Sequence, residues 1–207
     1  MDKTALQQVL SRLAPVEDPD AELEQYATPP AIAADVLQRM QLNNDLDGTV
    51  LDLGCGNGIF AIGAGVLGAD AVGVDVDGDA VAAARANLDT VEAAVDGSVT
   101  FETGDVRDLD RDVDVAVTNP PFGVQREDAN LVFLEAAFET ASVVYAVLHQ
   151  SRGQPGKTRS FLDRFAADHG FSTDVVTAYD FPLPRRFAHH DAEKEFIKVD
   201  LYRFEQV

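Results

Sequence analysis

The sequence has few of the residues that build disulfides, zinc sites or membrane anchors. One cysteine stands among 207 residues, which excludes an internal disulfide and a zinc site made of cysteines. No apolar run approaches the ~18 residues of a membrane span, and Met1–Thr4 begins no apolar signal region. The pair His189-His190 has no third ligand nearby, so no metal site is predicted. We expect a soluble, cytoplasmic protein.

Positive charge is also scarce. Sixteen basic residues, of which four are lysines, oppose 36 acidic residues, of which 25 are aspartates, so the net charge is −20. Such a chain repels itself unless salt screens its charges, and the screening length falls to about 3 Å at molar salt. The composition resembles that of proteins from halophilic archaea, and a merely acidic mesophilic protein is the alternative.

The negative charge is unevenly distributed along the chain. Residues 1–149 hold 27 acidic and seven basic residues, whereas residues 150–207 hold nine of each. Two basic stretches in the second part interrupt the acidic background, and a polyanion can approach there. The candidate RNA-binding residues are Arg152, Lys157, Arg159, Arg185 and Arg186. Solvated arginines in loops are the alternative interpretation.

The apolar pattern alternates between short β-rich runs and helical runs. Strands are predicted over residues 50–53, 71–76, 99–102, 113–118, 143–148, 174–179 and 198–204, with helices over 60–67, 79–91, 130–141 and 160–169. This order is typical of an α/β fold with a mostly parallel sheet, helices on both faces and an antiparallel hairpin at one edge.

Helical patterns also precede the first strand. One covers residues 3–14 and ends before Pro15, and a second follows Thr28-Pro29-Pro30. We interpret residues 1–207 as a single domain with an N-terminal helical extension over 1–45. Residues 153–156, Gly-Gln-Pro-Gly, are predicted to form a loop.

A glycine-rich turn follows the first predicted strand. Gly54, Gly56 and Gly58 alternate between strand and helix, where the missing Cβ atoms let the backbone approach a ligand. Asp75 ends the next strand, seventeen residues after Gly58, and its carboxylate can accept both hydroxyls of a ribose. The G-x-G-x-G spacing, with no arginine beside Asp75, favours a nucleoside cofactor without phosphate. Asp105 follows the third strand and can accept the amine of an adenine.

Asn119-Pro120-Pro121-Phe122 stands at the end of the fourth predicted strand. The prolines keep the backbone extended and remove two donors, so the Asn119 side-chain oxygen and the Pro120 carbonyl remain as acceptors. Phe122 adds an aromatic face. Two acceptors and a ring suit a planar base that carries an NH₂ group, and holding both N–H bonds aims the nitrogen lone pair at an electrophile. Catalysis then depends on positioning.

These motifs resemble those of class I S-adenosylmethionine-dependent methyltransferases that modify amino groups. Nearly the whole chain resembles the methyltransferase-like protein 5 family. The segments that carry the resemblance are Leu23–Pro29, Gly54–Gly58, Asn119–Gly123, Phe133-Leu134, Val144-Tyr145 with His149, and Val199–Phe204. The resemblance implies a Rossmann-like fold with a seven-stranded, mostly parallel sheet in the order 3-2-1-4-5-7-6. It also implies N6 methylation of an adenosine in small-subunit ribosomal RNA, with S-adenosylmethionine as donor and S-adenosylhomocysteine as product.

The resemblance further implies roles for individual residues. The expected cofactor-binding residues are Gln25, Tyr26, Thr28, Gly54, Gly56, Asn57, Gly58, Ile59, Asp75, Val76, Asp105, Val106 and Asn119. The expected catalytic residues, which would hold the target base, are Asn119, Pro120, Pro121 and Phe122. Eukaryotic members depend on a small zinc-binding activator subunit, and the predicted edge strand Val99–Phe101 is its candidate docking site. The chain departs from animal members at Phe181–Arg186, which bears on the RNA target site more than on the reaction.

Two other functions stay open. A protein methyltransferase that acts on the N5 of a glutamine uses the same Asn-Pro-Pro loop, and the acidic composition suits a protein partner. The segment Gln25–Thr28 argues against it. A ribosome-assembly factor that uses the fold only for binding is the second alternative, and the intact motifs argue against that. The sequence favours an RNA adenine-N6 methyltransferase.

Overall fold

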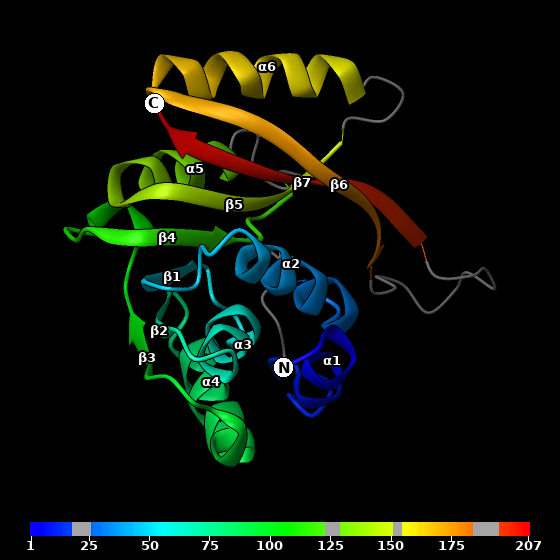
Figure 1. Ribbon diagram of the computed structural model, residues 1–207, viewed down its shortest axis with the longest axis vertical. Helices are drawn as coiled ribbons and strands as arrows, with labels where there is room; N and C mark the ends of the chain where they lie inside the picture. Colours follow the sequence, from blue (N-terminus) through cyan, green and yellow to red (C-terminus); the bar gives the residue numbers. More distant parts are fainter. Residues whose placement is uncertain (18–25, 123–128, 151–154, 184–194) are drawn as a thin grey trace.

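The computed structural model describes residues 1–17, 26–122, 129–150, 155–183 and 195–207, and it shows one twisted sheet between helices (Figure 1). The helices are α1 (Lys3–Leu10), α2 (Pro30–Leu42), α3 (Ile59–Val66), α4 (Gly78–Val91), α5 (Ala129–Thr140) and α6 (Pro155–Asp168). The strands are β1 (Thr49–Leu53), β2 (Asp70–Asp75), β3 (Val99–Thr103), β4 (Val113–Thr118), β5 (Ala141–His149), β6 (Phe171–Leu183) and β7 (Glu195–Gln206). Short 3-10 turns η1 (Glu92–Ala94) and η2 (Val106–Asp108) flank β3.

The strand order in the sheet is β3-β2-β1-β4-β5-β7-β6. Neighbouring strands from β3 to β5 are parallel, whereas β7 is antiparallel to both β5 and β6. The predicted fold class and strand order are therefore confirmed. Because β1 to β5 run in one direction, the segments that follow them gather at one edge of the sheet, where α/β proteins bind ligands.

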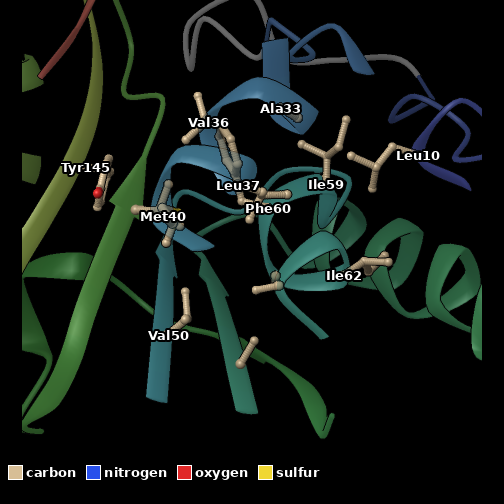
Figure 2. Packing of buried hydrophobic residues seen from close by; sticks show 14 of the residues in the cluster. Leu10, Ala33, Val36, Leu37, Met40, Val50, Ile59, Phe60, Ile62 and Tyr145 are labelled. Atoms are coloured by element: carbon tan, nitrogen blue, oxygen red, sulfur yellow. The ribbon is translucent and has the colours of Figure 1, made fainter. Parts of the chain in front are cut away.

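Two apolar clusters cover the two faces of the sheet. Along β4, Val115 and Val117 contact the cluster that holds α1 to α4, and Ala116 contacts the cluster that holds α5 and α6. This alternation follows from the two-residue repeat of a strand. Figure 2 shows the first cluster, in which α2 packs against α3 and β1 through residues such as Leu37 and Met40. Both faces of the central strands are buried, which explains why valine, leucine and alanine predominate in them.

The first helix is shorter than the apolar pattern predicts. It ends at Leu10 rather than Ala14, with Ser11 as its C-cap. The peptide groups of Ala14 are held instead by two side chains from other elements: its N–H donates to Asn87 Oδ1 at 2.8 Å, and its carbonyl accepts from Asn57 Nδ2 at 3.0 Å and from Asn87 Nδ2 at 2.9 Å. The prediction of a helix over residues 3–14 was wrong because these long-range hydrogen bonds replace the helical ones.

Two boundaries in the second half of the chain also differ from the prediction. Pro155 and Gly156 begin α6 instead of belonging to a loop, since proline is favoured in the first turn of a helix, where its missing N–H needs no partner. Strand β6 reaches Leu183 and includes Pro182, which an edge strand tolerates.

Among the described residues, no helix combines the length and apolar character needed to cross a membrane.

Candidate functional site

The glycine turn after β1 has a backbone that only glycine adopts readily. The φ angles of Gly54, Gly56 and Gly58 are 69°, 52° and 83°. A Cβ added to Gly54 would lie 2.8 Å from Cε1 of Phe133 on α5, whereas a Cβ on Gly56 would meet no atom within 4 Å. The turn is thus packed against α5 at one glycine and open at the next, so a ligand can approach the backbone at Gly56.

Asp75, at the end of β2, connects to this turn. Its Oδ2 accepts from the Gly56 N–H at 2.8 Å, and its Oδ1 accepts from the Asp77 N–H at 3.0 Å. Burial raises the pKa of the carboxyl group. Each carboxylate oxygen keeps a second lone pair, which suits the hydroxyls of a ribose. Next to it, the Val76 side chain is 55% exposed and offers an apolar contact for a planar ring, while Val106 after β3 is buried.

Asp105 lies beside Asp75, because the Gly104 N–H donates to the Asp75 carbonyl at 2.9 Å. Its carboxylate forms an ion pair with Arg107 and accepts from Arg107 Nε at 2.9 Å. Arg107 lowers the pKa of Asp105 to about 2. The predicted acceptor for an adenine amine is therefore at the expected edge of the sheet, ionised, and shared with Arg107.

Two residues predicted to line the cofactor have their side chains engaged elsewhere. The Asn57 amide donates to the Ala14 carbonyl, and its own backbone carbonyl accepts from Asn87 Nδ2 at 3.0 Å. Ile59, the first residue of α3, is buried in the cluster with α1 and α2 (Figure 2). The glycine turn is thereby tied to the N-terminal segment through Ala14.

The catalytic candidate Asn119 is oriented by a residue that precedes α2. Its Nδ2 donates to Thr28 Oγ1 at 3.0 Å. Its Oδ1 is buried and has no hydrogen-bond partner within the part of the chain that the structure describes. Just before it, Thr118 Oγ1 donates to the Leu53 carbonyl at 2.8 Å and joins the ends of β4 and β1. The loop therefore presents a fixed acceptor beside the glycine turn.

Phe122 belongs to an aromatic cluster rather than standing alone. Its ring stacks on Tyr26 at 5.8 Å between centroids and 14° between planes. Phe181 of β6 meets it edge to face at 5.2 Å, and His149 at the end of β5 lies 6.2 Å away. Tyr26 and Thr28, both predicted for the cofactor, thus contact the catalytic loop. The sequence did not place Phe181 beside the catalytic loop; its signals were an aromatic residue in the predicted hairpin connection and its position in the segment Phe181–Arg186 that departs from animal members.

Sequence reasoning also missed Asp52 of β1. The residue is 1% exposed; Oδ2 accepts from the Ala61 N–H at 3.0 Å, and Oδ1 has no partner among the described residues. Burial raises the pKa of this carboxyl group to about 7, and the neighbouring Asp75 adds to the effect. The nearby Cys55 thiol is also buried, which raises its pKa and leaves it protonated and unreactive.

The candidate RNA contacts are only partly within the described residues. Lys157 is exposed on the first turn of α6. Arg159 forms two hydrogen bonds with the wholly buried Asp200, from Nε to Oδ2 at 2.9 Å and from Nη2 to Oδ1 at 2.8 Å. The other candidate RNA contacts, Arg152, Arg185 and Arg186, lie outside the described residues. So does Gln25, which was predicted to bind the cofactor.

The loops at the carboxyl edge of the sheet correspond to those of a class I methyltransferase, and the methyltransferase small domain family matches residues 32–145, from α2 into β5. The chain is 33% identical to rRNA N(6)-adenosine-methyltransferase Mettl5 of Drosophila melanogaster over 97% of this chain and 94% of that protein. Identity to the zebrafish (Danio rerio) rRNA N(6)-adenosine-methyltransferase METTL5 is 31%, covering 96% of each. The chain belongs to this methyltransferase-like protein 5 family.

A solved structure extends the likeness to three dimensions. PH1948 from Pyrococcus horikoshii superposes with a TM-score of 0.86 at 33% identity, covering 99% of this chain and 98% of that one. The agreement includes the N-terminal helices as well as the sheet, since almost the whole chain is covered.

Proposed function

We propose that this chain transfers a methyl group from S-adenosylmethionine to the N6 amine of an adenosine in ribosomal RNA, with small-subunit RNA as the substrate. The observation that carries this function is the buried Asn119 Oδ1, which has no partner in the described part of the chain and stands next to the Pro120 carbonyl. The relatives named rRNA N(6)-adenosine-methyltransferases match the chain over almost its full length and favour an adenosine over a glutamine amide.

The residues around the glycine turn fit the cofactor. Gly56 leaves open space beside the backbone, Asp75 has lone pairs for the ribose, and Val76 offers an exposed apolar side chain to the adenine. When bound, the cofactor supplies an electrophilic methyl group on a sulfonium. The Asp75 carboxylate, which is already oriented by two backbone N–H groups, needs no rearrangement to accept ribose hydroxyls.

The chain's own residues contribute chiefly positioning. Thr28 holds the Asn119 amide so that Oδ1 accepts one N–H of the target amine, and the Pro120 carbonyl accepts the other. With both N–H bonds held, the nitrogen lone pair is directed toward the glycine turn. Phe122 supplies the aromatic surface for the base, with its ring supported by Tyr26 and Phe181.

Replacing Asn119 by Ala tests this function. Wild type and variant are incubated in high salt with labelled S-adenosylmethionine and unmodified small ribosomal subunits or their naked RNA, and the digested nucleosides are identified by mass spectrometry. We expect N6-methyladenosine with the wild type and none with Asn119→Ala, while the variant still binds the cofactor. A variant with a near-wild-type rate contradicts the mechanism. Label in a protein glutamine moves the function to the amide, and no label despite cofactor binding favours an assembly factor.

We also propose that a small zinc-binding activator subunit adds a strand to β3. The Ser98 carbonyl accepts from Ala71 N–H of β2 at 2.7 Å, so alternate residues such as Val99 and Thr103 direct their backbone groups away from β2. Residues 104–112, which join β3 to β4, contain only the turn η2. Thr103→Pro removes one outward N–H and should abolish co-purification with such a subunit, whereas Thr173→Pro, which also removes an N–H directed away from the sheet but on the opposite edge strand β6, should not. Equal co-purification of both variants contradicts docking at β3.

We further propose that residues 1–207 act in the cytoplasm as one methyltransferase domain. Its helical extension, residues 1–45, serves both halves of the site: Ala14 is bound to Asn57 in the glycine turn, and Thr28 is bound to Asn119 in the catalytic loop. Deletion of residues 1–45 should then abolish methylation of ribosomal RNA, and a truncated chain that folds and methylates at the wild-type rate contradicts this arrangement.

A further inference from the structure

The rotation of α6 about its axis is fixed by an ion pair between the partly exposed Arg159 and a buried carboxylate, Asp200. Arg159 reaches Asp200 of β7 with two hydrogen bonds of 2.9 and 2.8 Å, and Gln150 Nε2 donates to the same carboxylate at 2.6 Å. Asp200 is wholly buried, so breaking this pairing would leave an uncompensated charge in the interior. The first turn of α6 is therefore held beside the end of β5, with Arg159 facing the sheet.

The opposite side of α6 carries three residues with the spacing of one helix face. Lys157, Phe161 and Arg164 follow one another at intervals of four and three residues, and all three are exposed. The Phe161 side chain is 43% exposed, and its ring stacks on Phe165 at 6.1 Å with 23° between the planes. Neither cation has an ion-pair partner in the part of the chain that the structure describes. We name Lys157, Phe161 and Arg164 the α6 face.

The first turn of α6, where the α6 face begins, lies at the same end of the sheet as the proposed catalytic loop. His149, which ends β5, lies 6.2 Å from Phe122, and its neighbour Gln150 shares Asp200 with Arg159. From Lys157 to Arg164 the helix rises about 10 Å, and in Figure 1 α6 runs along the outside of the sheet toward the C-terminus. A strand of RNA whose target base enters at Asn119 can continue along this face.

Charge and chemistry favour RNA as the occupant. Residues 1–149 account for the entire net charge of −20, so most of the chain repels a polyanion. The α6 face combines two cations, neither of them ion-paired among the described residues, with an aromatic ring that packs against a second ring. Cations bind phosphates and rings stack on bases, which is how proteins bind unpaired RNA. We propose that the α6 face binds the RNA segment that flanks the target adenosine, an inference that rests on the proposed function.

The experiment measures RNA binding without cofactor, by fluorescence anisotropy of labelled small-subunit ribosomal RNA over a range of salt concentrations. Lys157→Gln/Arg164→Gln should weaken binding and reduce the slope of log K against log salt by about one per cation removed. Phe161→Ala should weaken it about fivefold or more, with little change in slope. Arg12→Gln, on an exposed residue that donates to the Thr90 carbonyl across the fold, is the matched control.

The same variants are then assayed for methylation. The α6-face variants should raise the KM for RNA and leave kcat and cofactor affinity unchanged, because none of these residues contacts the catalytic loop. If the wild type methylates adenosine but the variants bind RNA with wild-type affinity and slope, the inference is overturned, and a protein partner for this face would give that result. If RNA binding weakens as expected but no adenosine is methylated, the α6 face binds RNA but does not flank a target adenosine, and the proposed function fails.

Discussion

Asn119 and Thr28 stand 91 positions apart in the sequence, and one hydrogen bond of 3.0 Å joins them. Thr28→Val keeps the shape of the side chain but removes the acceptor for Asn119 Nδ2. A neutral hydrogen bond contributes about 1 kcal/mol, so we expect kcat for RNA methylation to fall up to about tenfold, with unchanged affinity for the cofactor. Steady-state kinetics and cofactor titration measure this.

Thr28→Ser is the control for that prediction, since it restores the hydroxyl and should restore kcat. The opposite pattern, weakened cofactor binding with normal kcat, would mean that Thr28 serves the cofactor, as the family resemblance implies. A loss of kcat therefore indicates that Thr28 positions Asn119, and a loss of cofactor affinity indicates that Thr28 binds the cofactor.

A second residue-scale prediction concerns the buried carboxyl group of Asp52. Its folded-state pKa of about 7 lies above the ordinary value of 3.8. Between these values the folded protein binds more protons than the unfolded chain, so stability falls as pH rises from about 4 to about 7. Asp52→Asn cannot titrate. We expect the free energy of unfolding of the wild type, relative to Asp52→Asn, to fall by up to about 4 kcal/mol over this range.

Denaturant unfolding of both proteins at constant high salt measures that difference. The other carboxylates titrate in both proteins and cancel, which isolates Asp52. A difference that stays constant from pH 4 to 7 would mean that Asp52 ionises near its ordinary pKa.

The sequence predicted the residues of the site better than their neighbours. Gly56, Asp75 and Asn119 could be proposed as site residues because each occupies a recognisable position after a strand. The partners of Asn119 and Phe122 could not be found in this way, since Thr28 and Phe181 come from distant segments and only tertiary packing brings them there. Arg159 was predicted to contact RNA because it lies in a basic stretch of the sequence. In the structure its guanidinium is bound to Asp200 of β7.

At the scale of elements, Asn87 of α4 joins the N-terminal segment to the glycine turn. Its amide contacts both peptide groups of Ala14 and the carbonyl of Asn57. Asn87→Ala leaves the Ala14 N–H and the Asn57 carbonyl without this partner, while the Ala14 carbonyl keeps its hydrogen bond from Asn57 Nδ2, and we expect the free energy of unfolding to fall by about 2 kcal/mol. Thermal and denaturant unfolding measure the loss.

The exposed Asp89 on the same helix provides the control, because Asp89→Ala changes helix propensity without touching Ala14. Hydrogen exchange at the amide of Ala14 gives a second measurement, and it should accelerate only in Asn87→Ala. An unchanged exchange rate together with unchanged stability would show that the N-terminal segment is held by its apolar contacts alone.

The element boundaries that the sequence predicted wrongly share one physical cause. The central strands were located well because burial on both faces makes them continuous apolar runs. The end of α1 and the length of β6 depend on partners that local patterns do not contain: side chains of Asn57 and Asn87 in the first case, and pairing with β7 from Phe171 to Leu183 in the second. The strand order came from the family resemblance rather than from periodicity.

At the scale of the whole molecule, ion pairs within the fold neutralise only part of the negative charge. Several arginines form ion pairs inside the fold: Arg203 of β7 joins Asp45 after α2, and Arg39 pairs with Asp35 within α2. Arg39 also helps to lower the pKa of Asp35 to about 2, together with Lys3 and Tyr179. These pairs leave a net charge of −20, and its self-repulsion opposes folding.

Stability should therefore rise with salt. Going from about 0.1 M to about 1 M KCl shortens the screening length from about 10 Å to about 3 Å, and we expect Tm to increase by several degrees. The connection from β3 to β4 offers a test, because Asp108, Asp110 and Asp112 are all exposed. Replacing all three by Asn should raise Tm in low salt and make the increase of Tm between low and high salt smaller. Replacing all three by Glu keeps the charges and should leave that increase unchanged. If all three proteins gain equally, salt stabilises the fold by strengthening apolar burial rather than by screening repulsion.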